Sequence, residues 1–303
     1  MMTSNARRTD VGAVLRAPLA ALQWRLLLLW LVFLLLPTAV AALPLWRLLS
    51  DLLDHSVHAA AWASQFDALM FGDVMSALGQ HGAALQGSLV LATVLALLLG
   101  PLLTGMTVAA GRAGRVLGLG QLLQSGVIEY GRMFRVLLWS LLPYAIAIGL
   151  GAMALGAAHK HADQAVLESA AGRFQHAALW VLAVLLALAH AVVESARAAF
   201  IVDPGLRSAT RALGRGFMQL LRRPLGTLMS YLVIGAVGYS VTLAFGVSRI
   251  QTAAVGLGGF LLALLLAELA VLAVGWTRIA RLFALAAVGR SLAPRRGGMS
   301  SVL

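Results

Sequence analysis

The residues of this sequence most able to do chemistry are ionisable side chains inside long apolar runs. Glu268 stands alone in the apolar run 261–274, and Glu194 and Arg197 interrupt another run, with His190 one helical turn before Glu194. If such runs cross a membrane, each charged group costs about 2.5–3.5 kcal/mol on insertion scales, so its presence needs a reason. These four residues are therefore the first candidates for a functional site.

The positions of these residues predict that they meet. At about 1.5 Å per residue, Glu268 and the Glu194/Arg197 pair reach a similar depth in two helices that run in the same direction, about 10–15 Å from one boundary. We predict an intramembrane polar cluster in which Arg197 is shared by both carboxylates, with His190 nearby. Two interpretations stay open: a neutral clasp that fixes two helices in register, and a proton or substrate path in which Glu268 changes its protonation.

Histidine and aspartate residues between the apolar runs form a second group. The candidates for metal binding are His55, His58, His159, His161 and Asp163. Imidazole and carboxylate groups are usual zinc ligands, and a zinc site here would indicate a membrane enzyme. Because the spacing matches no established zinc signature, solvated loops are the expectation, and neither a metal nor another cofactor is predicted.

Motifs of familiar enzyme classes are missing from the chain. It contains no cysteine, which excludes disulfides, thiolate metal sites and cysteine nucleophiles. It also has no phosphate-binding loop, no Gly-x-Ser-x-Gly elbow and no His-Glu-x-x-His pair. The sequence therefore argues against an enzyme, and no catalytic residue is predicted.

The composition indicates a membrane protein, since 61% of the 303 residues are hydrophobic and only 11% are charged, against about one quarter charged in soluble domains. A helix needs about 20 apolar residues to cross a bilayer. Six stretches qualify: 26–46, 85–110, 136–158, 177–202, 225–247 and 252–276. We predict an all-α transmembrane bundle, a single membrane domain with flexible tails over 1–20 and 291–303. The first stretch contains a motif like a signal-peptide cleavage site, but it continues to full spanning length, so a retained span is expected.

Basic residues predict the orientation of this bundle. When six spans alternate, all of the 23 Lys and Arg residues fall on one side except Arg47, Lys160, Arg173 and Arg249. Short loops rich in these residues stay in the cytoplasm, so both termini are predicted to be cytoplasmic. The basic residues follow the membrane borders without a compact, aromatic-interleaved patch, so nucleic acid is not expected as a partner.

The two inner loops each have the pattern of an amphipathic helix. Their arginines are Arg112, Arg115, Arg132 and Arg135 in the first loop and Arg207, Arg211, Arg215, Arg222 and Arg223 in the second. In the second loop, Leu206, Leu213, Phe217 and Leu220 gather opposite the arginines, as in a helix that lies flat in the interface. Contacts of these arginines with phospholipid head groups are worth about 1 kcal/mol each. The likeness of the loops predicts an internal duplication of 85–158 and 177–247.

One segment carries a family resemblance. Ala196-Arg197-Ala198-Ala199-Phe200-Ile201-Val202 leads to Gly205-Leu206-Arg207-Ser208-Ala209-Thr210-Arg211-Ala212-Leu213-Gly214-Arg215. This arrangement resembles uncharacterised bacterial six-span membrane proteins, among them the membrane domain attached to some glycerophosphoryl diester phosphodiesterases. The resemblance, over about 85–250, implies a six-span fold and the bacterial cytoplasmic (inner) membrane. It transfers no catalytic residue, and the longest outer loop, 47–84, is too short for a phosphodiesterase domain.

Three functions stay open, and the sequence favours them in the following order. The first is a non-enzymatic inner-membrane protein that handles a lipid-like or hydrophobic substrate or serves as the membrane partner of a larger assembly. Its expected partners are membrane phospholipids, with a protein partner or a second copy of the chain. The alternative is a proton-coupled transporter that uses Glu268 with His190, Glu194 and Arg197. A membrane enzyme with a His/Asp metal site on the outer face comes third.

Overall fold

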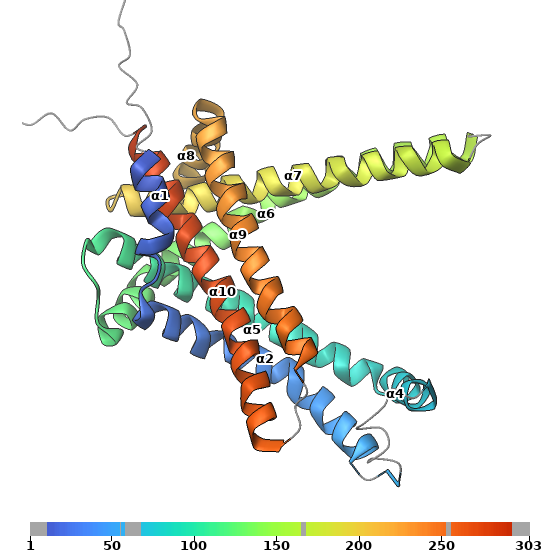
Figure 1. Ribbon diagram of the computed structural model, residues 1–303. Helices are drawn as coiled ribbons and strands as arrows, with labels where there is room; N and C mark the ends of the chain where they lie inside the picture. Colours follow the sequence, from blue (N-terminus) through green and yellow to red (C-terminus); the bar gives the residue numbers. More distant parts are fainter. Residues whose placement is uncertain (1–10, 55, 58–67, 165–167, 253–255, 293–303) are drawn as a thin grey trace, which may run out of the picture.

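All regular secondary structure in the described part of the chain is helical (Figure 1). The computed structural model describes residues 11–54, 56–57, 68–164, 168–252 and 256–292. The helices are α1 (Val11–Ala20), α2 (Trp24–Leu53), α4 (Ala68–Gln80), α5 (Gly82–Ala113), α6 (Leu119–Gln164), α7 (Glu168–Val202), α8 (Ala209–Arg222), α9 (Pro224–Gln251) and α10 (Gly256–Arg290). Six of them, α2, α5, α6, α7, α9 and α10, are long and apolar enough to cross a membrane. The predicted all-α bundle with six apolar spans is confirmed.

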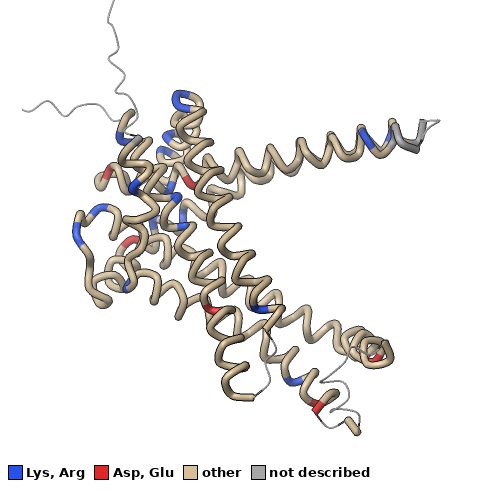
Figure 2. Tube along the Cα trace, in the orientation of Figure 1, with Lys and Arg blue, Asp and Glu red and all other residues tan. Residues whose placement is uncertain are grey.

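The six long helices pack largely as sequential pairs that converge at one end of the molecule. α2 packs on α5, α6 on α7 and α9 on α10. Figure 1 shows the α6–α7 pair projecting away from the α9–α10 pair at a wide angle. Most of the basic residues drawn in blue in Figure 2, all of them arginines, gather where the pairs converge, beside α1 and α8. We call this the arginine-rich end, and the start of α1 and the end of α10 both lie there.

The buried core is concentrated at the arginine-rich end. Its largest fully buried side chains include Leu26 of α2, Met106 of α5, Phe200 of α7, and Ile279 and Leu285 of α10. The opposite halves of the spans instead expose large apolar side chains, including Leu91, Val184, Leu243 and Leu262. Lipid tails are as apolar as leucine, so this exposure is not costly in a bilayer. The helices are therefore held together mainly at one end and expose apolar side chains over the rest of their length.

Helix α1 corrects one prediction. Residues 11–20 were expected to belong to a flexible tail, but they form a helix that packs on α10. Ala17 and Ala21 are buried, and the Trp276 Nε1–H group donates to the Pro18 carbonyl at 2.9 Å. The small side chains of Ala17 and Ala21 allow the two helices to approach closely. This packing is the reason that the segment is a helix and not a flexible tail. Residues 1–10 and 293–303 of the predicted tails lie outside the described residues.

The two inner loops fold differently from each other. The amphipathic segment of the first loop continues without a break into the third span, so both belong to α6. In the second loop α8 is a separate helix. Ser208 caps its start by accepting from the Arg211 N–H at 3.3 Å, and Arg223 leaves the helical conformation just before Pro224 opens α9. A separate interfacial helix is therefore present only in the second loop, and the internal duplication of 85–158 and 177–247 stays a prediction.

Helix α8 rests on α7 through small residues. Its buried positions are Ala209, Ala212, Gly216 and Gln219. A side chain at Gly216 would collide with the α7 backbone, since its Cβ would lie 2.7 Å from the Ala196 nitrogen and would also overlap the Val192 carbonyl oxygen. Of the predicted apolar face, Leu206 is buried and Phe217 is exposed. The face toward the protein is thus the small-residue stripe, and Phe217 lies outside this stripe, on the other side of it from the arginines.

Replacing Gly216 by alanine should loosen α8. We expect Gly216→Ala to lower the free energy of unfolding by about 1–3 kcal/mol, because the new methyl group must push the α7 backbone away. Thermal unfolding of the purified protein in detergent measures this. Gly214→Ala is the matched control, since nothing lies within 4 Å of a Cβ at that position of the same helix. The control should be neutral or slightly stabilising; equal melting temperatures for the two variants would contradict the packing.

Candidate functional site

Three of the predicted residues lie on one face of α7. Glu194 is 3% exposed, and its Oε1 atom accepts a hydrogen bond from Arg197 Nη1 at 2.8 Å. The Nε2 atom of His190 lies 3.7 Å from the same oxygen. Spacings of three and four residues bring side chains together on a helix, so the α7 sequence alone positions this group.

Two tyrosines from neighbouring helices complete the surroundings of His190. The Tyr144 hydroxyl of α6 forms a hydrogen bond of 2.6 Å with His190 Nδ1. The Tyr231 ring of α9 lies on the histidine with its centroid 5.6 Å away. His190 thereby connects α6, α7 and α9. Neither tyrosine was singled out from the sequence, because its approach depends on how the helices pack.

Helix α10 adds two arginines to this group. The guanidinium of Arg281 lies over the Tyr231 ring, with 5.1 Å from Cζ to the centroid. The guanidinium of Arg278 lies 6.0 Å from the centroid of the Trp30 ring. Both arginines act electrostatically on Glu194. We call Tyr144, His190, Glu194, Arg197, Tyr231, Arg278 and Arg281 the intramembrane cluster.

Positive charge exceeds negative charge in the intramembrane cluster. Three guanidinium groups lie within electrostatic range of the single carboxylate of Glu194, and Arg197 pairs with it. Within the described residues, neither Arg278 nor Arg281 forms an ion pair with a carboxylate. The Nε atom of Arg281 is buried without a hydrogen-bond partner, and so is the Oε2 atom of Glu194. The cluster therefore offers an anion one buried unused donor, the Nε–H group of Arg281.

Glu268 does not join the intramembrane cluster through Arg197. Its side chain forms no ion pair with any described residue, and its Oε2 atom is buried without a hydrogen-bond partner. The expected sharing of Arg197 by two carboxylates is thus not formed. The reason is the register of α10, which continues to Arg290. It brings Arg278 and Arg281 within electrostatic range of Glu194, whereas Glu268 lies ten residues, or about 15 Å, before Arg278 on the helix.

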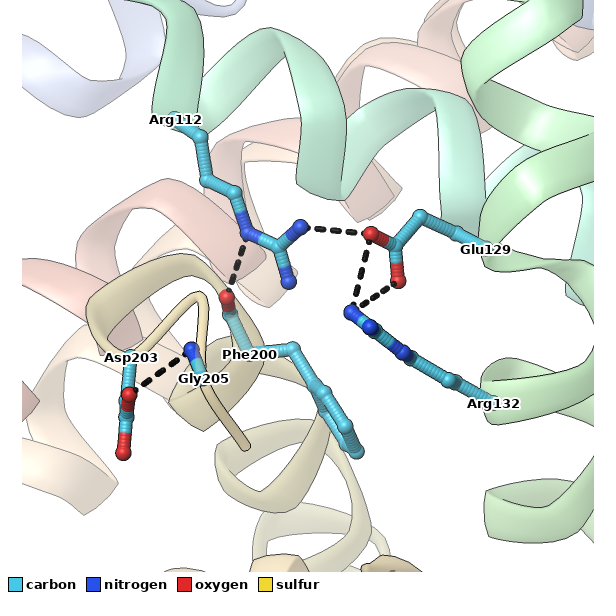
Figure 3. Close-up of polar contacts among 6 residues, drawn as sticks. All are labelled: Arg112, Glu129, Arg132, Phe200, Asp203 and Gly205. Atoms are coloured by element: carbon cyan, nitrogen blue, oxygen red, sulfur yellow. Dashed lines mark hydrogen bonds and ion pairs between the residues drawn. The ribbon is translucent and has the colours of Figure 1, made fainter. Parts of the chain in front are cut away.

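A second ion-pair network joins α5, α6 and α7 at the arginine-rich end (Figure 3). Glu129 of α6 is 6% exposed and binds Arg112 of α5 at 2.6 Å and Arg132 at 3.2 Å. The Nε–H of Arg112 donates to the Phe200 carbonyl at 2.7 Å, near the end of α7. Sequence reasoning missed Glu129 because it lies outside the expected spans, although it is the one carboxylate among the arginines of its loop.

The turn between α7 and α8 is fixed by Asp203. One carboxylate oxygen accepts from the Gly205 N–H at 3.0 Å, as Figure 3 shows. The other accepts from Arg215 Nη1 of α8 at 2.7 Å. Together with the bond from Arg112 to Phe200, these contacts hold the end of α7 at the point where α8 begins.

The arginines predicted to bind lipid head groups divide into two sets. Arg112 and Arg132 bind Glu129 and are partly buried, so they serve the protein interior. Arg215 pairs with Asp203 at the surface. The remaining arginines are exposed or partly exposed at the arginine-rich end: Arg115, Arg135, Arg207, Arg211, Arg222 and Arg223.

The histidine candidates show no metal site in the described part of the chain. No group of three or more His, Asp or Glu side chains there is arranged to hold a metal ion. His161 of α6 instead packs edge-on against the Phe174 ring of α7, at 4.4 Å between centroids, and His159 is exposed. His55 and His58 lie outside the described residues, and so does the side chain of Asp163.

Removal of the Glu129 carboxylate should destabilise the fold. We expect Glu129→Gln to lower the free energy of unfolding by about 1–3 kcal/mol, because two partly buried guanidinium groups lose their counter-ion. The measurement is thermal unfolding in detergent. Arg135→Gln is the control, since Arg135 is exposed and donates only to a carbonyl of its own helix. A variant as stable as the wild type would show that the network does not hold the three helices together.

Comparison with known proteins gives no relative from which a function can be transferred. No protein-family model, curated protein or solved structure matches the chain. The resemblance to the membrane domain of some phosphodiesterases therefore stays a prediction.

Proposed function

We propose that this multi-pass membrane protein binds an anionic, lipid-like molecule and handles it without a chemical reaction. Its charged head group is held by Arg278 and Arg281 of the intramembrane cluster, and its apolar part lies along the neighbouring spans. The observation that carries this proposal is the charge imbalance: three guanidinium groups lie within electrostatic range of one carboxylate inside helices apolar enough to span a membrane.

The cost of unpaired charge supports an anionic ligand. Removing an arginine from water without a counter-ion costs several kcal/mol in a low-dielectric interior, and Glu194 already bonds Arg197. A phosphate or carboxylate head group would supply the missing negative charge. It can also accept hydrogen bonds from two nitrogens of one guanidinium, which gives such pairs their strength and geometry. The unpartnered Nε of Arg281 is one donor for it.

The apolar surroundings support a lipid-like ligand over a small soluble anion. Arg278 is exposed on the side of α10, so a ligand can reach it from outside the helix bundle. Val274 lies one turn from Arg278 on the same helix and is exposed too, and the Trp30 ring covers the guanidinium from α2. A molecule that approaches through this surface meets apolar side chains first and the arginines last.

The placement of the protein belongs to the same proposal. With the arginine-rich end in the cytoplasm, as short basic loops favour, both ends of the chain are cytoplasmic. The intramembrane cluster then faces the inner leaflet of a bacterial cytoplasmic membrane. The exposed arginines around α8, including Arg207, Arg211 and Arg222, are in position to contact phospholipid head groups.

Glu268 favours a second candidate, proton-coupled transport. Its Oε2 atom is buried in a spanning helix without a hydrogen-bond partner. Ionisable residues in such positions mark proton relays in many transporters. In this version Glu268 binds and releases the proton, and the intramembrane cluster binds the transported anion.

Arg281→Gln tests the first candidate. Without ligand, we expect the variant to be as stable as the wild type or more stable, because an uncompensated positive charge is removed. Its affinity for an anionic phospholipid should fall at least about tenfold, since a charge-assisted hydrogen bond is worth about 1.5–3 kcal/mol. The measurement is the rise in melting temperature on titration of phosphatidylglycerol into detergent micelles, with phosphatidylcholine as the zwitterionic comparison.

The control for this test is Arg173→Gln, on the exposed far end of α7. It should keep the response of the wild type to phosphatidylglycerol. The proposal is contradicted if Arg281→Gln responds like the wild type. It is also contradicted if the variant is strongly destabilised without lipid, because Arg281 would then complete an internal ion-pair network.

Glu268→Gln tests the second candidate. The amide keeps the shape of the side chain and removes its titration, so we expect an unchanged or higher melting temperature together with complete loss of function. The readout is the growth or transport phenotype of cells whose own copy is deleted and which carry the variant. Full complementation by Glu268→Gln would end the transporter candidate and leave the first one standing.

A further inference from the structure

A second apolar surface lies on the opposite flank of α9 from Tyr231. α1, α9 and α10 enclose a laterally open groove with a volume of about 450 Å³. Its walls are formed chiefly by Leu15 and Pro18 of α1, Met229, Val233 and Val237 of α9, and Trp276 of α10. We call it the α1–α9 groove. It is separate from the intramembrane cluster, which shares none of these residues.

The groove walls favour a hydrocarbon chain. The hydroxyl of Ser230, one of its few polar groups, is already bonded to the Gly226 carbonyl at 2.7 Å. The Trp276 Nε1–H is likewise bonded to the Pro18 carbonyl. From Gly226 to Val237 the groove follows α9 over about 16 Å, at 1.5 Å per residue. A narrow apolar space of this length accommodates an extended alkyl chain.

Helix α1 shows that the groove opens toward lipid. Leu15 is 71% and Leu19 is 70% exposed, and Leu22 and Trp24 beyond the helix are exposed too. Such a row of apolar side chains requires apolar surroundings, as in helices that lie in the membrane interface. Trp24, with the Arg25 guanidinium 5.4 Å from its ring centroid, is the type of residue that marks the head-group level.

Arginines lie close in the chain to groove residues on both α1 and α9. Arg222 and Arg223 directly precede α9, within one turn of the groove residue Gly226, and exposed Arg16 follows Leu15 on α1. None of these arginines lines the groove itself, and a lipid phosphate that reached their side chains would gain about 1 kcal/mol from each at a membrane surface. The charge therefore matches an anionic phospholipid whose alkyl chain occupies the apolar part.

We propose that the α1–α9 groove binds one acyl chain of an anionic phospholipid from the surrounding leaflet, with the phosphate at Arg16 and Arg222. The lipid fills the space between α1 and α9 and secures α1 against the spanning helices. This site is independent of the ligand proposed for the intramembrane cluster. An experiment can therefore contradict one of the two proposals without contradicting the other.

Filling the groove tests this inference. Val233→Trp places an indole in the space of the acyl chain, and Leu232→Trp is the matched control because Leu232 is exposed beside the groove without lining it. Purified full-length protein is equilibrated with phosphatidylglycerol, and native mass spectrometry counts the retained lipids. We expect the wild type, Leu232→Trp and Arg281→Gln to retain a lipid that Val233→Trp loses by at least about tenfold.

A second measurement keeps the inference testable if Val233→Trp does not fold. Wild-type protein in vesicles of phosphatidylglycerol with a photoreactive acyl chain should crosslink at Met229 or Trp276. Retention of lipid by Val233→Trp, or crosslinks that avoid both residues, would overturn the proposal. Equal retention of phosphatidylcholine would overturn its head-group part. If Val233→Trp instead splits a dimer with no change in bound lipid, the groove is a contact between two copies and the proposal is wrong.

Discussion

The ion pair between Glu194 and Arg197 is the contact on which the chemistry of this protein depends. It occupies the only carboxylate of the intramembrane cluster and leaves Arg278 and Arg281 without an acidic partner among the described residues. A bilayer offers no water to compensate such charges, so an arrangement of this kind persists only where other groups meet the arginines. The tyrosine and tryptophan rings beside them supply part of this stabilisation. We propose that an anion completes it.

The surrounding fold makes this site reachable. Ion pairs at Glu129 and Asp203, together with the core around Phe200, join the spans at the arginine-rich end. Further along, the pairs separate, and their apolar side chains face outward (Figure 1). A rigid base with diverging spans exposes the sides of α9 and α10 to lipid. The protein therefore combines a fixed polar site with apolar access from the membrane.

Much of this architecture could be predicted from the sequence, because hydrophobic length dictates the spans and helix periodicity brings Glu194 close to His190 and Arg197. What could not be predicted depends on packing between helices. The alignment of α10 against α7 brings Arg278 and Arg281, and not Glu268, close to Glu194. Hydropathy identifies the two spans but does not determine how they align along each other. Glu129 is buried by contacts with α5 and α7, and these contacts cannot be predicted from the sequence of its own loop. Helix α1 was assigned to a tail because alanine packing leaves little signal in a short segment.

The most direct measurement is a cryo-EM map of the wild-type protein in nanodiscs of phosphatidylglycerol. The account predicts elongated non-protein density that ends in a head group at the Arg278 and Arg281 guanidinium groups. The same preparation in phosphatidylcholine should leave that position without an ordered anion. If Arg281 is instead paired with Glu268 or with another carboxylate of the protein in both lipids, the cluster is internally neutralised. The central claim would then be contradicted.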